Sequence, residues 1–258
     1  RAGEAPWTSA GDAKLISYSA TEAVLEFPLG DGTTRLTLKL DGGRVRVENT
    51  VTTGATRFNK SALAFALPAD EHFFGLGERF ASFDHRGFSL YSWAEEGALG
   101  GGENVPPGPE NPYPNGPSMT YFPVPFFLSS NGYGLHVDTT YRSELHLGSE
   151  DPAVWRAAVN ALTVNLTVYV SPEPVKVLDA FTTDTGRPLI PAPWVFGPRR
   201  RIGRGDRVDG GLEYEVMRAK HLPLTGMDDA VHFLPAESQL GIESDLQAWT
   251  SRAHQLGY

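Results

Sequence analysis

Apolar and polar residues alternate over short stretches in the first 170 residues, which is the pattern of half-buried β-strands. In Arg35–Leu40 every second residue is a leucine, and in Arg44–Glu48 valines alternate in the same way. Asp41-Gly42-Gly43 separates the two stretches, and an Asp-Gly turn favours a β-hairpin because its central residues adopt positive φ. Further strands are expected at Val24–Phe27, Gly134–Asp138, Tyr141–Leu147 and Leu162–Val170. Many short strands separated by turns predict an antiparallel β-sandwich.

The spacing of apolar residues becomes helical after Val170. Val177 and Phe181 are four residues apart, and Gly186 followed by Pro188 is typical of a helix end. The proline-rich segment that follows marks a boundary between a predicted sandwich domain, residues 1–187, and a second domain, residues 188–258.

Residues 188–258 have the pattern of the start of a parallel β/α barrel. In order, we expect a strand, a helix, a strand and a long amphipathic helix at residues 194–197, 212–219, 223–228 and 242–256. These are two β/α units, and two units cannot close a barrel of eight. The chain is therefore expected to be the N-terminal part of a longer polypeptide.

One long segment interrupts the strand pattern. Residues 97–117 contain six glycines and six prolines, which prevent a regular helix or strand. Aromatic residues precede it, with Asp84, His85 and Arg86 interleaved: Phe83, Phe88, Tyr91 and Trp93. A long insertion in a compact sheet domain is often functional, and the alternative is a decorated surface loop.

Composition excludes several classes of protein. Of the 258 residues, 40% are hydrophobic and 21% charged, as in ordinary globular domains. A net charge of −9 argues against a nucleic-acid partner, and no apolar run is long enough to predict a membrane helix. Without cysteine there are no disulfides or thiolate metal sites, and the seven histidines lack zinc-ligand spacing. We expect no metal and no cofactor, and the compartment stays open.

Acidic residues lie where a β/α barrel would bind its ligand. Asp228 and Asp229 end the second predicted strand, and His232 follows on the same loop. Neighbouring strand residues point in opposite directions, so at most one of the two aspartates faces the barrel mouth. The alternative is that one of them caps the loop or pairs with nearby arginines.

Arginines crowd the segment placed after the first predicted barrel strand: Arg199, Arg200, Arg201, Arg204 and Arg207. Such a cluster can hold an anionic group through bidentate hydrogen bonds, which leaves room for an anionic sugar. The alternative is a solvated loop in which the arginines form salt bridges.

Four segments, in this order, resemble glycoside hydrolase family 31. FFGLGERF at residues 73–80 resembles the family's Phe-Tyr-Gly-Leu-Gly-Glu segment. Residues 121–129 and the Gly-Tyr-Gly at residues 132–134 are similar to a second stretch of that family, and residues 186–197 to its junction between sandwich and barrel. Apart from the resemblance, Gly75 and Gly77 indicate a tight turn in which side chains would clash.

The resemblance implies a retaining α-glycosidase with a mutarotase-like sandwich followed by a (β/α)8 barrel. Both catalytic aspartates of this family lie on later barrel strands, so no residue of this chain inherits a catalytic role. A substrate-contacting aspartate after the second strand carries over to Asp228 or Asp229. The family shows Asp-x-Asp there and this chain has Asp-Asp-Ala, which leaves the choice between the two open.

The resemblance also implies that the loop at residues 97–117 reaches over the barrel mouth. Aromatic faces stack on sugar rings, so the expected platforms outside the barrel are Phe83, Tyr91, Trp93 and Tyr113. Asp84, which lies among them in the sequence, is a further expected substrate-binding residue. The implied partners are a carbohydrate substrate and the rest of the barrel in the same polypeptide. A second reading stays open, in which the chain is a non-catalytic carbohydrate-binding or interaction module with a remnant of a barrel.

Overall fold

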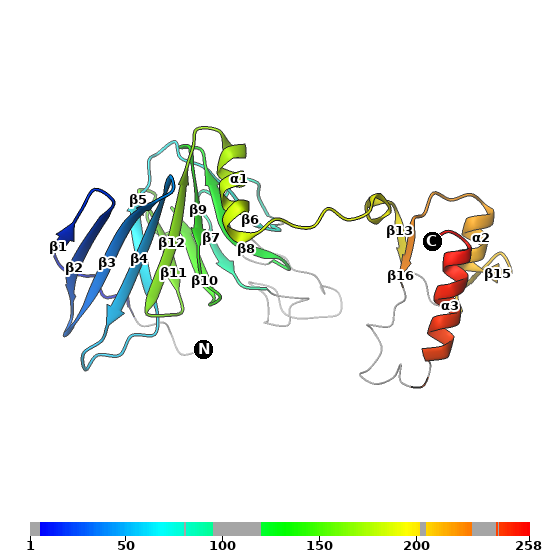
Figure 1. Ribbon diagram of the computed structural model, residues 1–258. Helices are drawn as coiled ribbons and strands as arrows, with labels where there is room; N and C mark the ends of the chain where they lie inside the picture. Colours follow the sequence, from blue (N-terminus) through cyan, green and yellow to red (C-terminus); the bar gives the residue numbers. More distant parts are fainter. Residues whose placement is uncertain (1–5, 80, 95–119, 202–204, 229–240, 242) are drawn as a thin grey trace. The chain divides into compact units, whose positions relative to one another are not determined.

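The computed structural model describes residues 6–79, 81–94, 120–201, 205–228, 241 and 243–258. The chain divides into two compact units, Arg1–Arg187 (unit 1) and Pro188–Tyr258 (unit 2), which are described separately (Figure 1).

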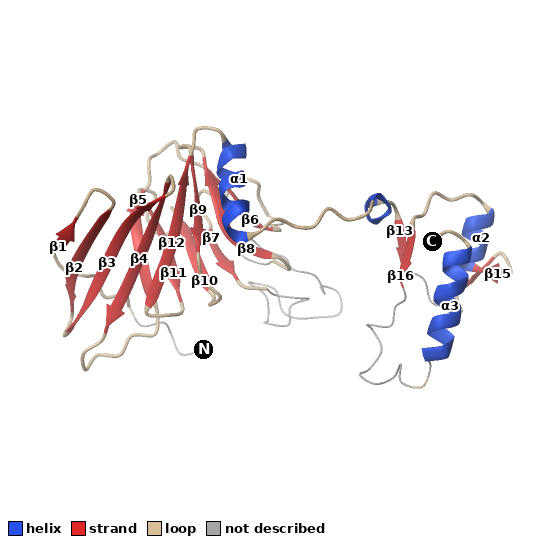
Figure 2. Ribbon diagram, in the orientation of Figure 1, coloured by secondary structure: helices blue, strands red, loops and turns tan. Residues whose placement is uncertain are grey.

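Unit 1 contains two antiparallel β-sheets (Figure 2). The larger has eight strands in the order β1-β2-β3-β4-β12-β9-β8-β6. Its strands are β1 (Lys14–Tyr18), β2 (Glu22–Leu29), β3 (Gly32–Asp41), β4 (Arg44–Thr52), β6 (Phe73–Gly77), β8 (Pro123–Ser129), β9 (Tyr133–Val137) and β12 (Thr163–Val170). The smaller sheet has the order β5-β11-β10-β7, from β5 (Ser61–Ala66), β7 (Ser89–Ser92), β10 (Ser143–Leu147) and β11 (Val154–Val159).

The core of unit 1 lies between the two sheets. Phe73 and Phe127 of the larger sheet are fully buried, and their rings meet edge to face at 5.1 Å. Trp155 of β11 contacts both rings from the smaller sheet, at 6.4 and 5.7 Å. This packing of one inner face on the other confirms the predicted β-sandwich.

The local sequence accounts for the strands that alternate most clearly. Gly42 and Gly43 have φ of 56° and 85°, and they join β3 to β4 in the hairpin that the Asp-Gly turn predicted. The other expected strands overlap β2, β9, β10 and β12. The prediction missed β1, β5, β6, β7, β8 and β11, of which β6 is a Phe-Phe-Gly-Leu-Gly segment without regular alternation.

Helix α1 (Pro174–Thr185) packs on the face of the larger sheet that points away from the core. Phe181 stacks on Phe126 of β8 at 4.0 Å, and Val177 is buried beside it. Gly134 permits this approach, because a Cβ there would lie 2.4 Å from a Val177 methyl group. The helix begins with proline in its first turn and ends before Gly186, which has φ of 96°.

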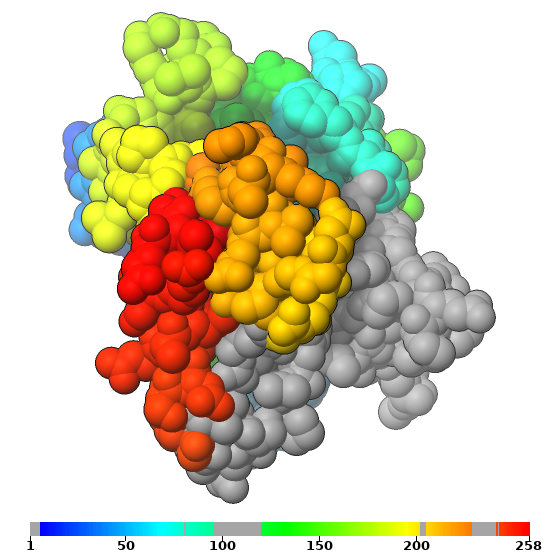
Figure 3. Space-filling view, turned by 90° about the vertical axis from the view of Figure 1, so that its right-hand side faces the viewer, coloured from blue at the N-terminus to red at the C-terminus, as the bar shows by residue number. Residues whose placement is uncertain are grey.

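Unit 2 combines short strands with two helices. In chain order its elements are the 3₁₀ helix η1 (Pro193–Phe196), β13 (Arg199–Arg201), β14 (Arg207–Val208), β15 (Gly211–Leu212), α2 (Glu213–Ala219), β16 (Gly226–Asp228) and α3 (Glu243–Gln255). β13 and β16 pair in parallel, and Tyr214 of α2 meets Trp249 of α3 edge to face at 6.4 Å. Figure 3 shows α3 beside the segment that carries α2.

The first strand of unit 2 corrects the prediction. Residues 194–197 were expected to form it, but Pro193–Phe196 is a 3₁₀ turn and the strand is Arg199–Arg201. Proline fixes φ and lacks an N–H, which favours the first position of a helical turn over a strand interior. The three arginines therefore form the strand, and do not lie in the loop after it.

Candidate functional site

The parallel pair of strands in unit 2 places Asp228 at the C-terminal end of the small sheet. Arg199 is opposite Gly226 and Arg201 is opposite Asp228, so both strands end at the same edge. Helix α2 lies between β13 and β16 in the chain, which makes this a β-α-β unit. Ligands of open and closed β/α sheets bind at the carboxyl ends of the strands, which is where Asp228 lies.

The two faces of this small sheet carry different partners. Arg200 points toward α2, where its Nε donates to Glu213 Oε1 at 3.1 Å. Side chains alternate along a strand, so Arg199 and Arg201 lie on the opposite face, together with Asp228. On that face Arg199 donates from Nη2 to Asp228 Oδ1. Asp228 therefore points away from the face on which α2 packs.

The Arg199–Asp228 ion pair is partly solvated. The two side chains are 45% and 38% exposed. An ion pair in this setting contributes about 1 kcal/mol or less to stability. Its main consequence is to hold the carboxylate in one orientation. Two other predicted residues, Asp229 and His232, lie outside the described residues, as does Arg204.

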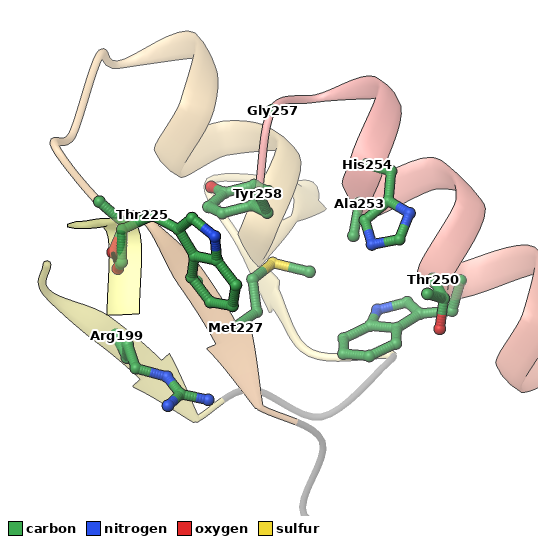
Figure 4. Close-up of a pocket in the computed structure, with 11 residues that line it drawn as sticks. Arg199, Thr225, Met227, Thr250, Ala253, His254, Gly257 and Tyr258 are labelled. Atoms are coloured by element: carbon green, nitrogen blue, oxygen red, sulfur yellow. Dashed lines mark hydrogen bonds between the residues drawn. The ribbon is translucent and has the colours of Figure 1, made fainter. Parts of the chain in front are cut away.

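A cavity of about 520 Å³ lies between β16 and α3 (Figure 4). Trp194, Arg199, Met227, Trp249 and Tyr258 are among the residues that line it. No aspartate or glutamate is among the described residues of its lining, so those residues offer no carboxylate for acid–base chemistry. The Trp249 indole nitrogen is buried there and has no hydrogen-bond partner among the described residues.

The predicted aromatic platforms of unit 1 lie on or beside β7 and in the turn before it. Trp93 follows β7 and is 50% exposed. Tyr91 lies within β7, where the Arg142 guanidinium is 4.1 Å from its ring centroid. Phe83 is 82% exposed, and its ring is 5.1 Å from that of Phe74. Tyr113 and the loop at residues 97–117 lie outside the described residues.

Asp84 holds the turn between β6 and β7. Its carboxylate is 2.6 Å from His72 Nδ1 and accepts hydrogen bonds from the backbone N–H groups of Phe73 and Arg86. Burial opposes ionisation, but these hydrogen bonds outweigh it and lower the pKa of Asp84 below its ordinary value. The described contacts of Asp84 thus fix local structure.

A charged cluster on the smaller sheet was not predicted. Glu144 is buried and accepts a hydrogen bond from Lys60 Nζ at 3.1 Å, and His146 Nε2 is 3.6 Å from its other oxygen. The adjacent His146 imidazole, together with Lys60 and Arg142, outweighs burial and lowers the pKa of Glu144 to about 2. A carboxyl group that stays ionised is unsuited to act as a general acid at neutral pH. The signal was the alternation of Glu144 and His146 on one face of a strand.

The described residues contain no group of three or more His, Cys, Asp or Glu side chains placed to hold a metal ion. Among them there is also no helix with the length and apolar character needed to cross a membrane.

Residues 7–145 match the glycosyl hydrolase 31 N-terminal galactose mutarotase-like domain. The match spans more than half of the chain, which thus belongs to glycoside hydrolase family 31 and carries the N-terminal domain of that family. The resemblance of the chain to this family is confirmed.

The curated relatives of this chain include glycosidases. It is 31% identical over 142 residues to the α-xylosidase XylQ of Lactiplantibacillus pentosus, covering 55% of this chain and 16% of the relative. It is 27% identical over 202 residues to the sulfoquinovosidase of Agrobacterium fabrum, covering 75% of this chain and 29% of the relative. The chain thus spans less than a third of the length of either relative.

Solved structures share the fold at lower identity. The family 31 dextranase of Flavobacterium johnsoniae, complexed with glucose, matches 97% of this chain with a TM-score of 0.63 at 15% identity, over 37% of its own length. A family 31 sulfoquinovosidase from E. rectale matches 77% of this chain with a TM-score of 0.61 at 20% identity, over 29% of its length.

Proposed function

We propose that this chain is the N-terminal part of a retaining α-glycosidase that removes terminal α-linked sugars by double displacement. The observation that carries the proposal is a parallel β-α-β unit that follows a family 31 N-terminal domain in the chain and ends in Asp228. In this proposal β13, α2, β16 and α3 are the first two β/α units of an eight-stranded barrel.

Two carboxylates about 5 Å apart carry out retaining glycoside hydrolysis, one as the nucleophile and the other as the acid and base. In the proposed enzyme both are aspartates that lie beyond residue 258, on later strands of the same polypeptide. This chain contributes the substrate-binding side of the site and no catalytic residue.

Asp228 is the aspartate proposed to contact the sugar. In a β/α barrel, helices cover the outer face of the strands and the opposite face lines the interior. Asp228 lies on the face opposite to α2, where Arg199 orients its carboxylate. An oriented carboxylate accepts hydrogen bonds from two sugar hydroxyls, whereas Asp229 lies outside the described residues.

The loop at residues 97–117 is proposed to contribute sugar contacts from unit 1. Trp93, half exposed at the end of β7, leads into this loop and offers an aromatic face. Tyr113 and His232 are proposed as further contacts. Asp84 is a supporting residue in this proposal, because its carboxylate is engaged by His72 and two backbone N–H groups.

The test is cleavage by the full polypeptide that carries this chain. The panel contains aryl α-glucoside, α-xyloside and α-sulfoquinovoside, chosen from the activities of the named relatives, and NMR identifies the anomer released first. We expect the α-anomer. A β-anomer, or no turnover on any α-glycoside, would refute the proposal.

Asp228→Asn tests the binding role in the same assay. We expect kcat/KM to fall at least tenfold, on the order of 1.4 kcal/mol. Asp209→Asn is the matched control, because Asp209 is 61% exposed in the same unit and pairs only with Lys220 among the described residues. An equal loss in both variants would argue against substrate contact by Asp228.

A second candidate function is a non-catalytic carbohydrate-binding module. The observation that favours it is that unit 1 has a core of its own between two complete sheets. Isothermal titration of residues 1–258 with oligosaccharides, combined with the cleavage assay of the full polypeptide, separates the two candidates. Saturable binding together with an inactive full polypeptide would favour the module.

A further inference from the structure

The inner face of strand β4 contains one polar position. Val47 and Val51 point into the sandwich core, and alternation places the side chain at position 49 between them. That side chain is Asn49, which is only 5% exposed. Thr34 lies beside it on β3 and is 7% exposed. Two polar groups thus replace core side chains at one end of the sandwich.

A cavity of about 610 Å³ opens at these residues. Its lining comes from β2, β3 and β4 of the larger sheet, from β5 of the smaller sheet and the loop at residues 56–60 before it, and from the segment at residues 6–10. The side chains that matter for recognition are Asn49, Thr34, Ser61, Trp7, Phe58 and Arg57. We call it the Asn49 cavity. Its volume is in the range of roughly 300–1,000 Å³ that is usual for small-ligand sites.

The hydrogen bonds of the buried polar residues leave one donor unused. Thr34 donates to Asn49 Oδ1 at 2.8 Å, and Ser61 donates to the carbonyl of Ala161 at 2.8 Å. The Asn49 amide nitrogen, by contrast, donates to no acceptor among the described residues. This N–H₂ group is therefore available to donate to an acceptor of a ligand in the cavity.

Aromatic rings flank the same cavity. Trp7 is 42% exposed, and the Arg156 guanidinium is 4.8 Å from its ring centroid, which fixes the ring over the smaller sheet. Phe58 is half-buried in the loop before β5. Aromatic rings next to a buried amide donor and hydroxyl groups suit a ligand with one apolar face and several hydroxyl oxygens.

Charge narrows the class of ligand. Arg57 and Lys60 line the cavity, and no carboxylate is among the described lining residues. Lys60 is engaged by Glu144, which leaves a weakly positive lining. Such a lining disfavours a cationic ligand and accepts a neutral polyhydroxylated one.

We propose that the Asn49 cavity binds a neutral sugar, with a ring oxygen or hydroxyl accepting from the Asn49 amide and the apolar face of the ring against Trp7. This site is non-catalytic. It lies wholly within unit 1, goes beyond the proposed hydrolase activity, and does not depend on it.

The experiment is an NMR titration of the ¹⁵N-labelled 258-residue chain with isomaltotriose, and separately with maltotriose. We expect the side-chain NH₂ signals of Asn49 and the indole N–H of Trp7 to shift together and to saturate with one dissociation constant. Sorbitol at equal concentration serves as an acyclic polyol and should give no saturable shift. The absence of saturable shifts at Asn49 with both sugars would overturn the proposal.

Two variants assign the contacts. Trp7→Ala should weaken sugar binding at least tenfold, and its exposure means that the fold survives, as the remaining amide spectrum will show. Tyr18→Ala is the control, because Tyr18 is a 79% exposed aromatic residue of β1 outside the cavity. Unchanged affinity in Trp7→Ala would overturn the proposed stacking. The titration measures binding to this chain alone, without the rest of the polypeptide. Its outcome is therefore independent of whether the full polypeptide cleaves α-glycosides.

Discussion

Tyr169 of β12 donates a hydrogen bond to Asp184 Oδ2, in the last turn of helix α1, at 2.9 Å. Arg44 of β4 also donates to this carboxylate. The other attachment of the helix is apolar, through Phe181 and Val177. Helix α1 is therefore held on the sheet by packing along its length and by one polar anchor near its C-terminus. It is the last element of unit 1, so this anchor fixes where the chain leaves the sandwich.

Replacing this anchor should destabilise unit 1. In Asp184→Ala the Tyr169 hydroxyl and the Arg44 guanidinium lose an acceptor, and we expect the free energy of unfolding to fall by about 2 kcal/mol. Asp179→Ala is the matched control, because Asp179 lies on the same helix, is 65% exposed and pairs with Arg187. We expect that change to cost about 0.5 kcal/mol or less. Urea denaturation followed by circular dichroism measures both, and equal losses would contradict the anchor.

Two glycines with the same φ should respond differently to alanine. Gly77 and Gly87 both have φ of 84°. A Cβ at Gly77 would lie 2.0 Å from the carbonyl oxygen of Phe122, whereas nothing lies within 4 Å of one at Gly87. We expect Gly87→Ala to cost about 1–2 kcal/mol, from the left-handed conformation alone.

Gly77→Ala should cost at least about 3 kcal/mol, because the strands β6 and β8 must also separate. Thermal or urea unfolding of the two variants gives the difference directly. If the two costs agree within error, close strand contact does not explain the glycine at position 77.

The sequence predicted those structural features that are determined by residues close together in the chain. The β3–β4 hairpin followed from a turn of three residues between two alternating segments. Strand β13 could not be predicted in this way, because three consecutive arginines show no apolar alternation. They form a strand because they pair in parallel with β16, which lies 27 residues later in the chain. The position of Asp228 at a strand end was foreseeable. Its partner Arg199 and the face it occupies required the register of that pairing. Asn49 left a local signal, a polar residue in an apolar series, but the cavity beside it depends on strands distant in sequence.

Acid should destabilise unit 1 through Glu144. Its pKa is lowered to about 2 in the fold, against an ordinary value of 4.5. The stabilisation is therefore complete above pH 4.5 and is lost as pH falls from 4.5 toward 2. We expect Glu144→Gln to lower the free energy of unfolding at pH 7 by about 3 kcal/mol and to flatten its pH dependence in this range.

Glu173→Gln is the control for the acid range, because Glu173 is 62% exposed and pairs with Lys176. Its effect at pH 7 should stay within about 0.5 kcal/mol. A wild-type slope that persists in Glu144→Gln between pH 4.5 and 2 would show that other carboxylates dominate acid unfolding.

The buried His85 and the half-buried His136 should make stability depend on pH in a separate range, below neutrality. His85 is 4% exposed, and its Nε2 donates to the carbonyl oxygen of Gly75 at 2.9 Å. Burial, with the nearby Arg79 charge, lowers the pKa of His85 below its ordinary value of 6.5, and burial lowers that of His136 in the same direction. The unfolded chain binds protons first, so this stabilisation is present above pH 6.5 and is lost as pH falls below it, through the folded pKa.

Unfolding free energies at pH 7.5, 6.0 and 5.0 test the upper part of this range, above the interval from pH 4.5 to 2 in which the Glu144 contribution is lost. His85→Gln keeps a donor for the Gly75 carbonyl and cannot titrate, so stability should fall less steeply below pH 6.5 than in the wild type. Each histidine accounts for at most about 1.4 kcal/mol per pH unit, so His136→Gln should remove a comparable share of the slope. His254→Gln, at an exposed position of α3, should leave the slope unchanged. If His85→Gln retains the full wild-type slope, protonation of this imidazole is not coupled to unfolding, and its hydrogen bond to Gly75 survives in the charged state.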